Sequence, residues 1–156
     1  MSLRDRLHAE VTAAMRSGDA LRRDTLRLAE NAIYNAEKRD RRAYSDDDVV
    51  AILGREVKAR RESVDAFRAG GREDLAAKEE AEIAILSAFL PAPLSEADLR
   101  DLVAEAIGAT GAASARDLGR VMGWLAPRTR GRADGRQLSE LVARALSGGA
   151  LSGGEA

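Results

Sequence analysis

Apolar residues recur along most of the chain at the three- and four-residue intervals of amphipathic helices. The first stripe consists of Leu3, Leu7, Val11 and Met15. Ser2 precedes this stripe and Asp5 follows three residues later, so a hydroxyl can cap a backbone N–H while a carboxylate faces the positive end of the helix dipole. This pattern predicts a first helix that opens at Ser2 and ends at Ser17-Gly18-Asp19.

Three further helices are predicted before residue 91. Asp19, Ser45 and Asp74 stand near the residues where they start. Gly70-Gly71 ends the third helix of the chain, and Pro91 ends the fourth because proline cannot continue a helix. The residues expected to face the core are Leu21, Leu28, Ile33 and Ala36 in the second helix, Val49, Ile52, Leu53, Val57, Val64 and Phe67 in the third, and Leu75, Ile83, Leu86, Phe89 and Leu90 in the fourth.

Beyond the hinge at Pro91-Ala92-Pro93, the helical pattern breaks into three shorter segments. The residues that open them are Ser95 with Asp98, Ser114 with Asp117, and Asp134 with Gln137. The first two short helices are expected to end at Gly108 and Pro127. The core residues of the three segments are expected to be, in order, Leu99, Leu102, Val103 and Ile107; Leu118, Val121, Met122 and Leu125; and Leu138, Leu141, Val142 and Leu146.

These elements predict an all-α fold. An N-terminal helical sub-domain of about four helices occupies residues 1–91, and a small three-helix tail-like sub-domain occupies residues 92–147. Residues 148–156 are rich in glycine and serine and are predicted to form a flexible tail. Aromatic residues make up only 3% of the chain, while the strong helix formers Ala, Leu, Arg and Glu dominate, which favours helices over strands.

The composition also limits where the protein works. There is no cysteine, which excludes disulfides, thiolate metal sites and a cysteine nucleophile. No stretch approaches the roughly 20 apolar residues that a membrane span needs, and the start of the chain alternates charged and apolar residues. We therefore expect a cytoplasmic protein that does not associate with membranes.

Few residues could carry catalysis. His8 is the single histidine and lies far in sequence from any partners for a catalytic triad, so an exposed or packing role is expected for it. Glu79, Glu80 and Glu82 are interpreted as the solvated face of a charged helix. The sequence has neither a metal-ligand spacing nor a phosphate-binding loop. We predict no catalytic residues, no metal and no cofactor.

The stretch from Arg116 to Arg136 concentrates positive charge in a chain whose net charge is only -1. It holds six arginines against two acids and is rich in turn-forming residues. Arginine forks on phosphate oxygens, helped by backbone N–H groups at the helix that opens at Asp134, would make it a local RNA-binding segment. An exposed loop that only aids solubility is an equally good interpretation of the composition. The candidate RNA-binding residues are Gly119, Arg120, Arg128, Arg130, Arg132 and Arg136.

Two neighbouring features allow more than one interpretation. Trp124 is expected to belong to the core rather than to form a platform for a base. Gly119 and Gly123 lie four residues apart and would let another helix or an RNA backbone approach closely, with helix packing favoured.

A second basic strip is formed by Arg55, Lys58 and Arg61 at three-residue spacing in the third helix. Glu56 and Glu62 interrupt it, so ion pairs within the helix are at least as good an interpretation as an RNA contact. The run from Lys38 to Arg42 suits a solvated helix C-terminus.

Four segments of the sequence resemble the GatB/YqeY family, and specifically its stand-alone YqeY-like members. The resemblance covers nearly the whole chain. The segments are Gly54-Arg55-Glu56-Val57-Lys58-Ala59-Arg60-Arg61-Glu62-Ser63, Phe89-Leu90-Pro91 with Leu94-Ser95-Glu96, Asp117-Leu118-Gly119-Arg120-Val121-Met122-Gly123, and Gly131-Arg132-Ala133-Asp134-Gly135-Arg136.

The resemblance implies a helical N-terminal sub-domain followed by a three-helix tail like the one that ends the B subunit of the glutamine-dependent aminoacyl-tRNA amidotransferase. It further implies a tRNA-binding helical module linked to tRNA-dependent amidotransfer or aminoacyl-tRNA synthesis, with tRNA held by its shape and phosphates. One alternative is a protein-interaction adaptor for an amidotransferase or synthetase. Another is a component of a carbon-nitrogen ligase with glutamine as amido-N-donor, although no residues here resemble a catalytic cradle for that reaction.

Overall fold

The computed structural model describes residues 1–148 and confirms the all-α fold. Within these residues there are seven α-helices, one short 3-10 helix and no strand. The elements are α1 (Leu3–Ser17), α2 (Ala20–Asp40), α3 (Asp46–Ala69), α4 (Glu73–Ser87), α5 (Glu96–Thr110), η1 (Ala115–Asp117), α6 (Leu118–Thr129) and α7 (Gly135–Leu146). Most of the predicted flexible tail, from residue 149 onward, lies outside the described residues.

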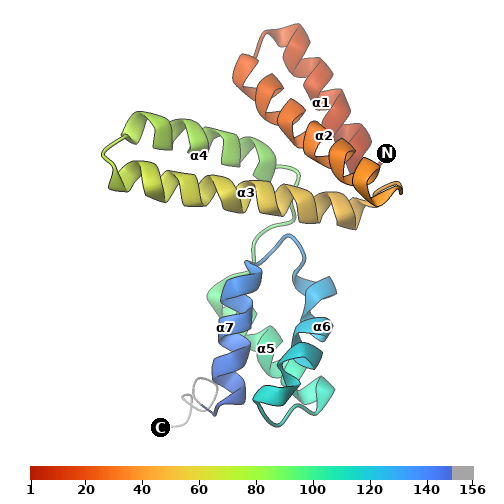
Figure 1. The fold of residues 1–156 in the computed structure, drawn as a ribbon, viewed down its shortest axis with the longest axis vertical. Helices are drawn as coiled ribbons and strands as arrows, with labels where there is room; N and C mark the ends of the chain where they lie inside the picture. The colour runs from red at the N-terminus through yellow and green to blue at the C-terminus, as the bar shows by residue number, and fades with distance from the viewer. Residues whose placement is uncertain (149–156) are drawn as a thin grey trace. The chain divides into compact units, whose positions relative to one another are not determined.

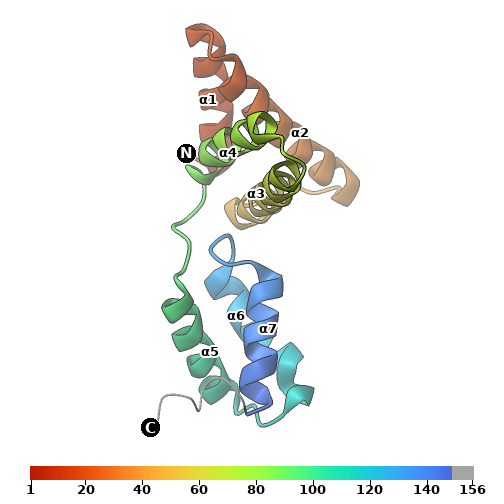
Figure 2. The same ribbon diagram turned by 90° about the vertical axis from the view of Figure 1, so that its left-hand side faces the viewer.

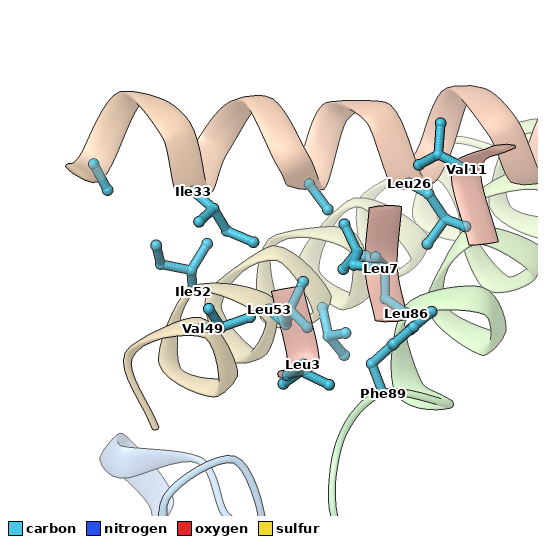
Figure 3. Close-up of a cluster of buried hydrophobic side chains, with 13 residues drawn as sticks. Leu3, Leu7, Val11, Leu26, Ile33, Val49, Ile52, Leu53, Leu86 and Phe89 are labelled. Atoms are coloured by element: carbon cyan, nitrogen blue, oxygen red, sulfur yellow. The ribbon is translucent and has the colours of Figure 1, made fainter. Parts of the chain in front are cut away.

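The chain groups into two compact units, Met1–Pro91 and Ala92–Ala156. The first unit contains two helical hairpins, α1 with α2 and α3 with α4, which pack against each other (Figures 1 and 2). Their shared core is apolar and is drawn in Figure 3. Leu7, Leu26 and Leu53 have no exposed surface in this core, because all three lie where the two hairpins meet.

Side-chain caps start several of these helices at the predicted residues. Ser2, Ser45 and Ser95 each accept a hydrogen bond from the backbone N–H three residues later, and the acid at that later position accepts one in return from the backbone N–H of the serine. Asp19 caps α2 in a simpler way, by accepting from the Arg22 N–H at 3.1 Å. These starts were predictable because a capping box satisfies otherwise unpaired backbone donors through contacts between near neighbours in sequence.

The predicted stripes on α1 and α2 contain two errors. Met15 and Leu28 were expected in the core, but they are 51% and 57% exposed, while Ala14 and Leu26 are buried. A helix has 3.6 residues per turn, so a strict four-residue repeat has drifted off the buried face by its fourth member, and Ala14 takes that place. Leu28 is five positions from buried Ile33, which puts it well round the helix from the face that meets the core.

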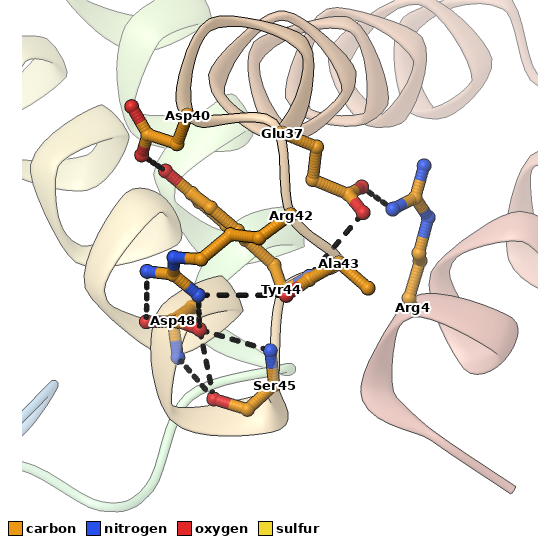
Figure 4. A network of polar contacts seen from close by, with 8 residues as sticks. All are labelled: Arg4, Glu37, Asp40, Arg42, Ala43, Tyr44, Ser45 and Asp48. Carbon is orange, nitrogen blue, oxygen red and sulfur yellow. Dashed lines mark hydrogen bonds and ion pairs between the residues drawn. The ribbon is translucent and has the colours of Figure 1, made fainter.

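A network of polar contacts holds the connection between α2 and α3 (Figure 4). Both terminal nitrogens of Arg42 donate to the Asp48 carboxylate, at 2.7 and 3.2 Å, and Asp48 also accepts from the Ser45 N–H at 3.0 Å. The Arg42 guanidinium, together with the Ser45 groups, holds the pKa of Asp48 well below its usual range. In the same network Glu37 pairs with Arg4 on α1. The basic end of α2 therefore serves local structure here, as a solvated helix terminus would.

The second unit packs α5, α6 and α7 around an apolar cluster that includes Val103, Val121, Leu125 and Val142. Here two predicted helix ends were wrong. Gly108 lies inside α5, which continues to Gly111, where the backbone turns left-handed with φ of 66°. That conformation is one that glycine adopts without strain, so Gly111 ends the helix.

Pro127 lies inside α6 rather than at its end. A proline cannot donate to the carbonyl four residues earlier, yet α6 runs on to Thr129. Two side chains support this last turn: Arg128 donates to the Trp124 carbonyl at 2.6 Å, and Thr129 donates to the Leu125 carbonyl at 3.0 Å. These bonds hold the turn that follows the proline, at the Trp124 and Leu125 carbonyls.

Among the described residues, no helix combines the length and the apolar character required to cross a bilayer.

Candidate nucleic-acid interface

The six candidate arginine and glycine positions all fall in the second unit, along α6, the turn after it and the start of α7. Gly119 and Arg120 lie in the first turn of α6, and Arg128 lies in its last turn. Arg130 and Arg132 belong to the turn, and Arg136 lies in the first turn of α7. Arg120, Arg128, Arg130 and Arg136 are exposed, whereas Arg132 is half-buried.

One face of α6 is open. Gly119 and Gly123 are exposed, and a Cβ atom added to either would meet nothing within 4 Å. Neither glycine is therefore needed for packing inside this unit, where the favoured helix-packing role is wrong. Exposed Arg120 follows Gly119 on α6, and exposed Arg116 lies in η1, the 3-10 helix that directly precedes α6. The result is a helix face where a ligand can reach the backbone between positive side chains.

Arg120 is held at one edge of this face by Asp117. Its Nη2 atom donates to Asp117 Oδ1 at 3.0 Å, and 58% of the Arg120 side chain stays exposed. The backbone N–H groups of Ala113 and Ser114 donate to the other carboxylate oxygen, at 2.8 and 3.3 Å. These backbone bonds, followed by Arg120, lower the pKa of Asp117. Asp117 therefore stays ionised and orients Arg120 while leaving it accessible.

Arg128 is engaged with its own helix. Its Cζ atom lies 3.6 Å from the centre of the Trp124 ring, which is a cation–π contact. Trp124 is partly buried and packs against the apolar cluster of the unit, as expected for a core residue. Arg128 thus covers a ring that could otherwise stack with a base.

Arg136 and Asp134 define the start of α7. Arg136 is 81% exposed on its side chain, and its Nε lies 3.5 Å from Glu140. The Asp134 carboxylate caps the helix by accepting from the Arg136 N–H at 3.0 Å. The expected anion site at this helix N-terminus is weakened, because the cap already supplies a negative charge and uses a backbone donor.

Arg132 makes contacts inside the unit. Its Nε donates to the Ala92 carbonyl at 3.0 Å, and its backbone carbonyl accepts from the Leu94 N–H at 2.9 Å. These partners are 40 and 38 positions earlier in the chain, and no sequence pattern pointed to them.

The second basic strip lies on the exposed side of α3, since Arg55, Lys58 and Arg61 are all exposed. Arg60, one position from Arg61, points instead toward α4 and is only 9% exposed. It donates to Glu56 at 2.9 Å and to Glu82 at 3.2 Å. Ion pairing within the helix is therefore real for Arg60, while the three strip residues face outward.

The interpretation of Glu79, Glu80 and Glu82 as one solvated face was wrong for two of them. Glu82 is nearly buried against Arg60, and Glu79 is half-buried. Burial, followed by the nearby Glu82 charge, raises the pKa of Glu79. Only Glu80 is exposed, where it pairs with Arg68 at 2.8 Å. The packing of α4 against α3 determines which of these glutamates are buried, and helical spacing alone does not reveal it.

His8 is exposed on α1, and its Nδ1 lies 2.8 Å from Glu30 Oε1 on α2. Glu30 was not singled out from the sequence, because it is 22 positions away and meets His8 only through the hairpin. Over residues 1–148, no group of three or more histidine, aspartate or glutamate side chains is arranged to hold a metal ion.

The fold and this basic surface define a small helical protein with a three-helix C-terminal unit. A family model described as Yqey-like protein matches residues 4–146, and the chain belongs to this family. It is 30% identical over 131 residues to altered inheritance of mitochondria protein 41, mitochondrial, from Pyrenophora tritici-repentis, covering 82% of this chain and 71% of that protein. It is also 37% identical over 67 residues to an uncharacterized protein of Schizosaccharomyces pombe, covering 43% of this chain and 54% of that one.

Membership of the family confirms the resemblance noted in the sequence. The name of the Pyrenophora protein places that relative in mitochondria. The cytoplasmic location expected for this chain therefore stays a prediction.

Proposed function

We propose that the C-terminal unit binds tRNA through its shape and its phosphates, and that the protein serves tRNA-dependent amidotransfer or aminoacyl-tRNA synthesis as an accessory module. The observation that carries this proposal is the open face of α6, where Gly119 and Gly123 are exposed, with exposed Arg120 on the same helix and exposed Arg116 in η1 just before it. A sugar–phosphate backbone needs both features, since small residues permit close approach and arginine forks match phosphate oxygens.

The distribution of charge supports a local site. The stretch from Arg116 to Arg136 carries six arginines and two acids, whereas α5 in the same unit carries exposed Glu96, Asp98, Asp101 and Glu105. The attraction for a polyanion therefore comes from one part of the unit rather than from its overall charge. An RNA would approach the arginine-rich stretch and be repelled by the acidic helix, which orients the complex.

The surface favours contact with phosphates over the reading of bases. Single-stranded RNA is commonly bound by exposed aromatic rings that stack with bases. In the described part of the second unit, Trp124 is partly buried and covered by Arg128, and no large apolar side chain is strongly exposed. Recognition of folded RNA by backbone contacts fits this surface better.

The test is retention of total tRNA on filters by the purified full chain at about 50 mM and about 200 mM salt. We expect micromolar or tighter binding at the lower concentration and a steep loss at the higher one. The double variant Arg130→Gln/Arg136→Gln should bind all tRNA species more weakly and should reduce the slope of log affinity against log salt by about 1.5 to 2, which corresponds to two phosphate contacts.

Arg100→Gln/Arg144→Gln is the matched control, because it removes two exposed arginines from the same unit outside the arginine-rich stretch. It should leave the slope nearly unchanged. An equal loss in both variants would mean that only net charge matters. The triple variant Arg55→Gln/Lys58→Gln/Arg61→Gln asks in the same assay whether the strip on α3 adds a second contact.

Absence of binding by the wild type at low salt would overturn the proposal. Capture of an amidotransferase or synthetase that survives high salt would then favour the adaptor role.

A further inference from the structure

Arg132 lies where the turn between α6 and α7 meets the linker that follows Pro91. Three hydrogen bonds converge on it: its N–H donates to the Thr129 carbonyl at 2.9 Å, its carbonyl accepts from the Leu94 N–H at 2.9 Å, and its Nε donates to the Ala92 carbonyl at 3.0 Å. The first bond closes the turn. The other two join the turn to the linker.

The linker itself has few backbone donors with which to bind the rest of the unit. Ala92 lies between two prolines, neither of which has a backbone N–H, and a residue that precedes proline is restricted to extended conformations. The Leu94 N–H is thus the first backbone donor after Pro93. Without the Arg132 side chain, the Ala92 carbonyl would have to turn to water, and the backbone carbonyl of residue 132 would be the one remaining link of the two between turn and linker.

We propose that Arg132 is a positioning residue that ties the linker to the arginine-bearing turn, so that the two move as one body. The side chain holds Ala92 while the backbone of the same residue holds Leu94, and Arg130 is two positions away in the turn. This inference rests on the proposed function for its effect on RNA, whereas the tie itself can be tested without RNA.

Two consequences follow for RNA binding. First, a rigid turn presents Arg130 and Arg136 in one arrangement, which reduces the entropy lost when phosphates are bound. Second, a ligand that orders the turn also orders the linker, the point where the chain passes from the first unit to the second. Arg132 therefore contributes to affinity mainly through the order of its neighbours, and its charge matters less than that of Arg130.

The experiment measures backbone amide exchange at Leu94 by NMR in the full chain, without RNA and with tRNA. Without RNA, Arg132→Gln should speed exchange at Leu94 by about tenfold, because the linker loses the charged hydrogen bond at Ala92 that keeps Leu94 against the backbone carbonyl of residue 132. Arg130→Gln, which removes the same charge two positions away, should leave the exchange unchanged. Circular dichroism checks that both variants keep their helices, and Arg132→Lys keeps the charge in case the glutamine variant unfolds.

The salt dependence of tRNA binding separates positioning from direct contact. Arg132→Lys should weaken binding severalfold with an unchanged salt slope, whereas Arg130→Gln should reduce the slope by about one. Unchanged exchange at Leu94 in Arg132→Gln and Arg132→Lys would overturn the tie. A reduced slope in Arg132→Lys would also count against the positioning role. If the wild type binds no tRNA, the proposed function fails while the exchange data still decide whether the tie exists.

Discussion

The Arg128 guanidinium lies on the Trp124 ring, with Cζ 3.6 Å from the ring centre, and Arg128 Nη1 donates to the Trp124 backbone carbonyl at 2.6 Å. This contact shields the single tryptophan of the chain at the end of the helix whose open face carries the proposed RNA site. The protein thus contains its own fluorescent reporter close to that site.

Replacing Arg128 with Ala should uncover the ring. We expect quenching of the tryptophan fluorescence by acrylamide to increase about twofold, because a stacked cation no longer blocks one face of the indole. Arg116→Ala is the control, since that exposed arginine lies outside this stack. Equal quenching in wild type and Arg128→Ala would show that Arg128 does not cover Trp124 in solution.

Gly123→Ala should stabilise the protein and weaken RNA binding. The added methyl group meets no atom within 4 Å, and alanine in a helix interior is better than glycine by about 0.5 to 1 kcal/mol. We expect a higher melting temperature by circular dichroism together with weaker retention of tRNA. The loss of binding arises because the methyl group stands on the face that the RNA backbone must approach.

A lower melting temperature in Gly123→Ala would show that the glycine face packs against protein in solution. Unchanged tRNA binding, beside increased stability, would place the RNA elsewhere. Gly108→Ala is a matched control in α5, because a Cβ there also meets nothing within 4 Å, so it should add stability without affecting binding.

Core substitutions in the two units test whether the two predicted sub-domains fold independently. Leu53→Ala in the first unit and Leu125→Ala in the second each remove a fully buried side chain, at a cost of about 2 to 5 kcal/mol. If each unit folds alone, amide exchange should accelerate only in the unit that carries the substitution. Faster exchange throughout the chain in either variant would show a single cooperative unit.

Glu79→Gln should raise the melting temperature at neutral pH. Burial and the Glu82 charge raise the pKa of Glu79, so the folded state holds this proton more tightly than the unfolded state, and ionisation at neutral pH opposes folding. The advantage of the variant should shrink as pH falls through the raised pKa and vanish below the ordinary value of 4.5, where both states are protonated. Thermal melts of both proteins between about pH 3 and about pH 7 measure this difference in melting temperature.

Glu80→Gln is the comparison for that experiment. Glu80 is exposed and pairs with Arg68, so its removal should give no stabilisation at any pH. A gain of the same size in both variants would point to the total charge of α4 rather than to the burial of Glu79.

Local patterns along the chain specified the helices and many of their starts. Ser2, Ser45 and Ser95 cap their helices through partners three residues away, and such local contacts depend on no distant part of the chain. The apolar spacing also placed most of the core, including Ile33, Leu53 and Leu125. It failed at Met15, because a four-residue repeat drifts off the buried face of a helix, and at Leu28, which lies well round α2 from the buried Ile33.

The residue pairs that shape the candidate sites depend instead on how the helices pack. Arg60 meets Glu82 across 22 positions because α3 pairs with α4, and Arg132 reaches Ala92 across 40 positions because the turn after α6 folds back to the linker. The open face around Gly123 likewise depends on which sides of α6 its neighbours cover. Local periodicity specifies secondary structure, whereas contacts between distant residues depend on which helices pack together, and a single helical pattern carries no information about its partner.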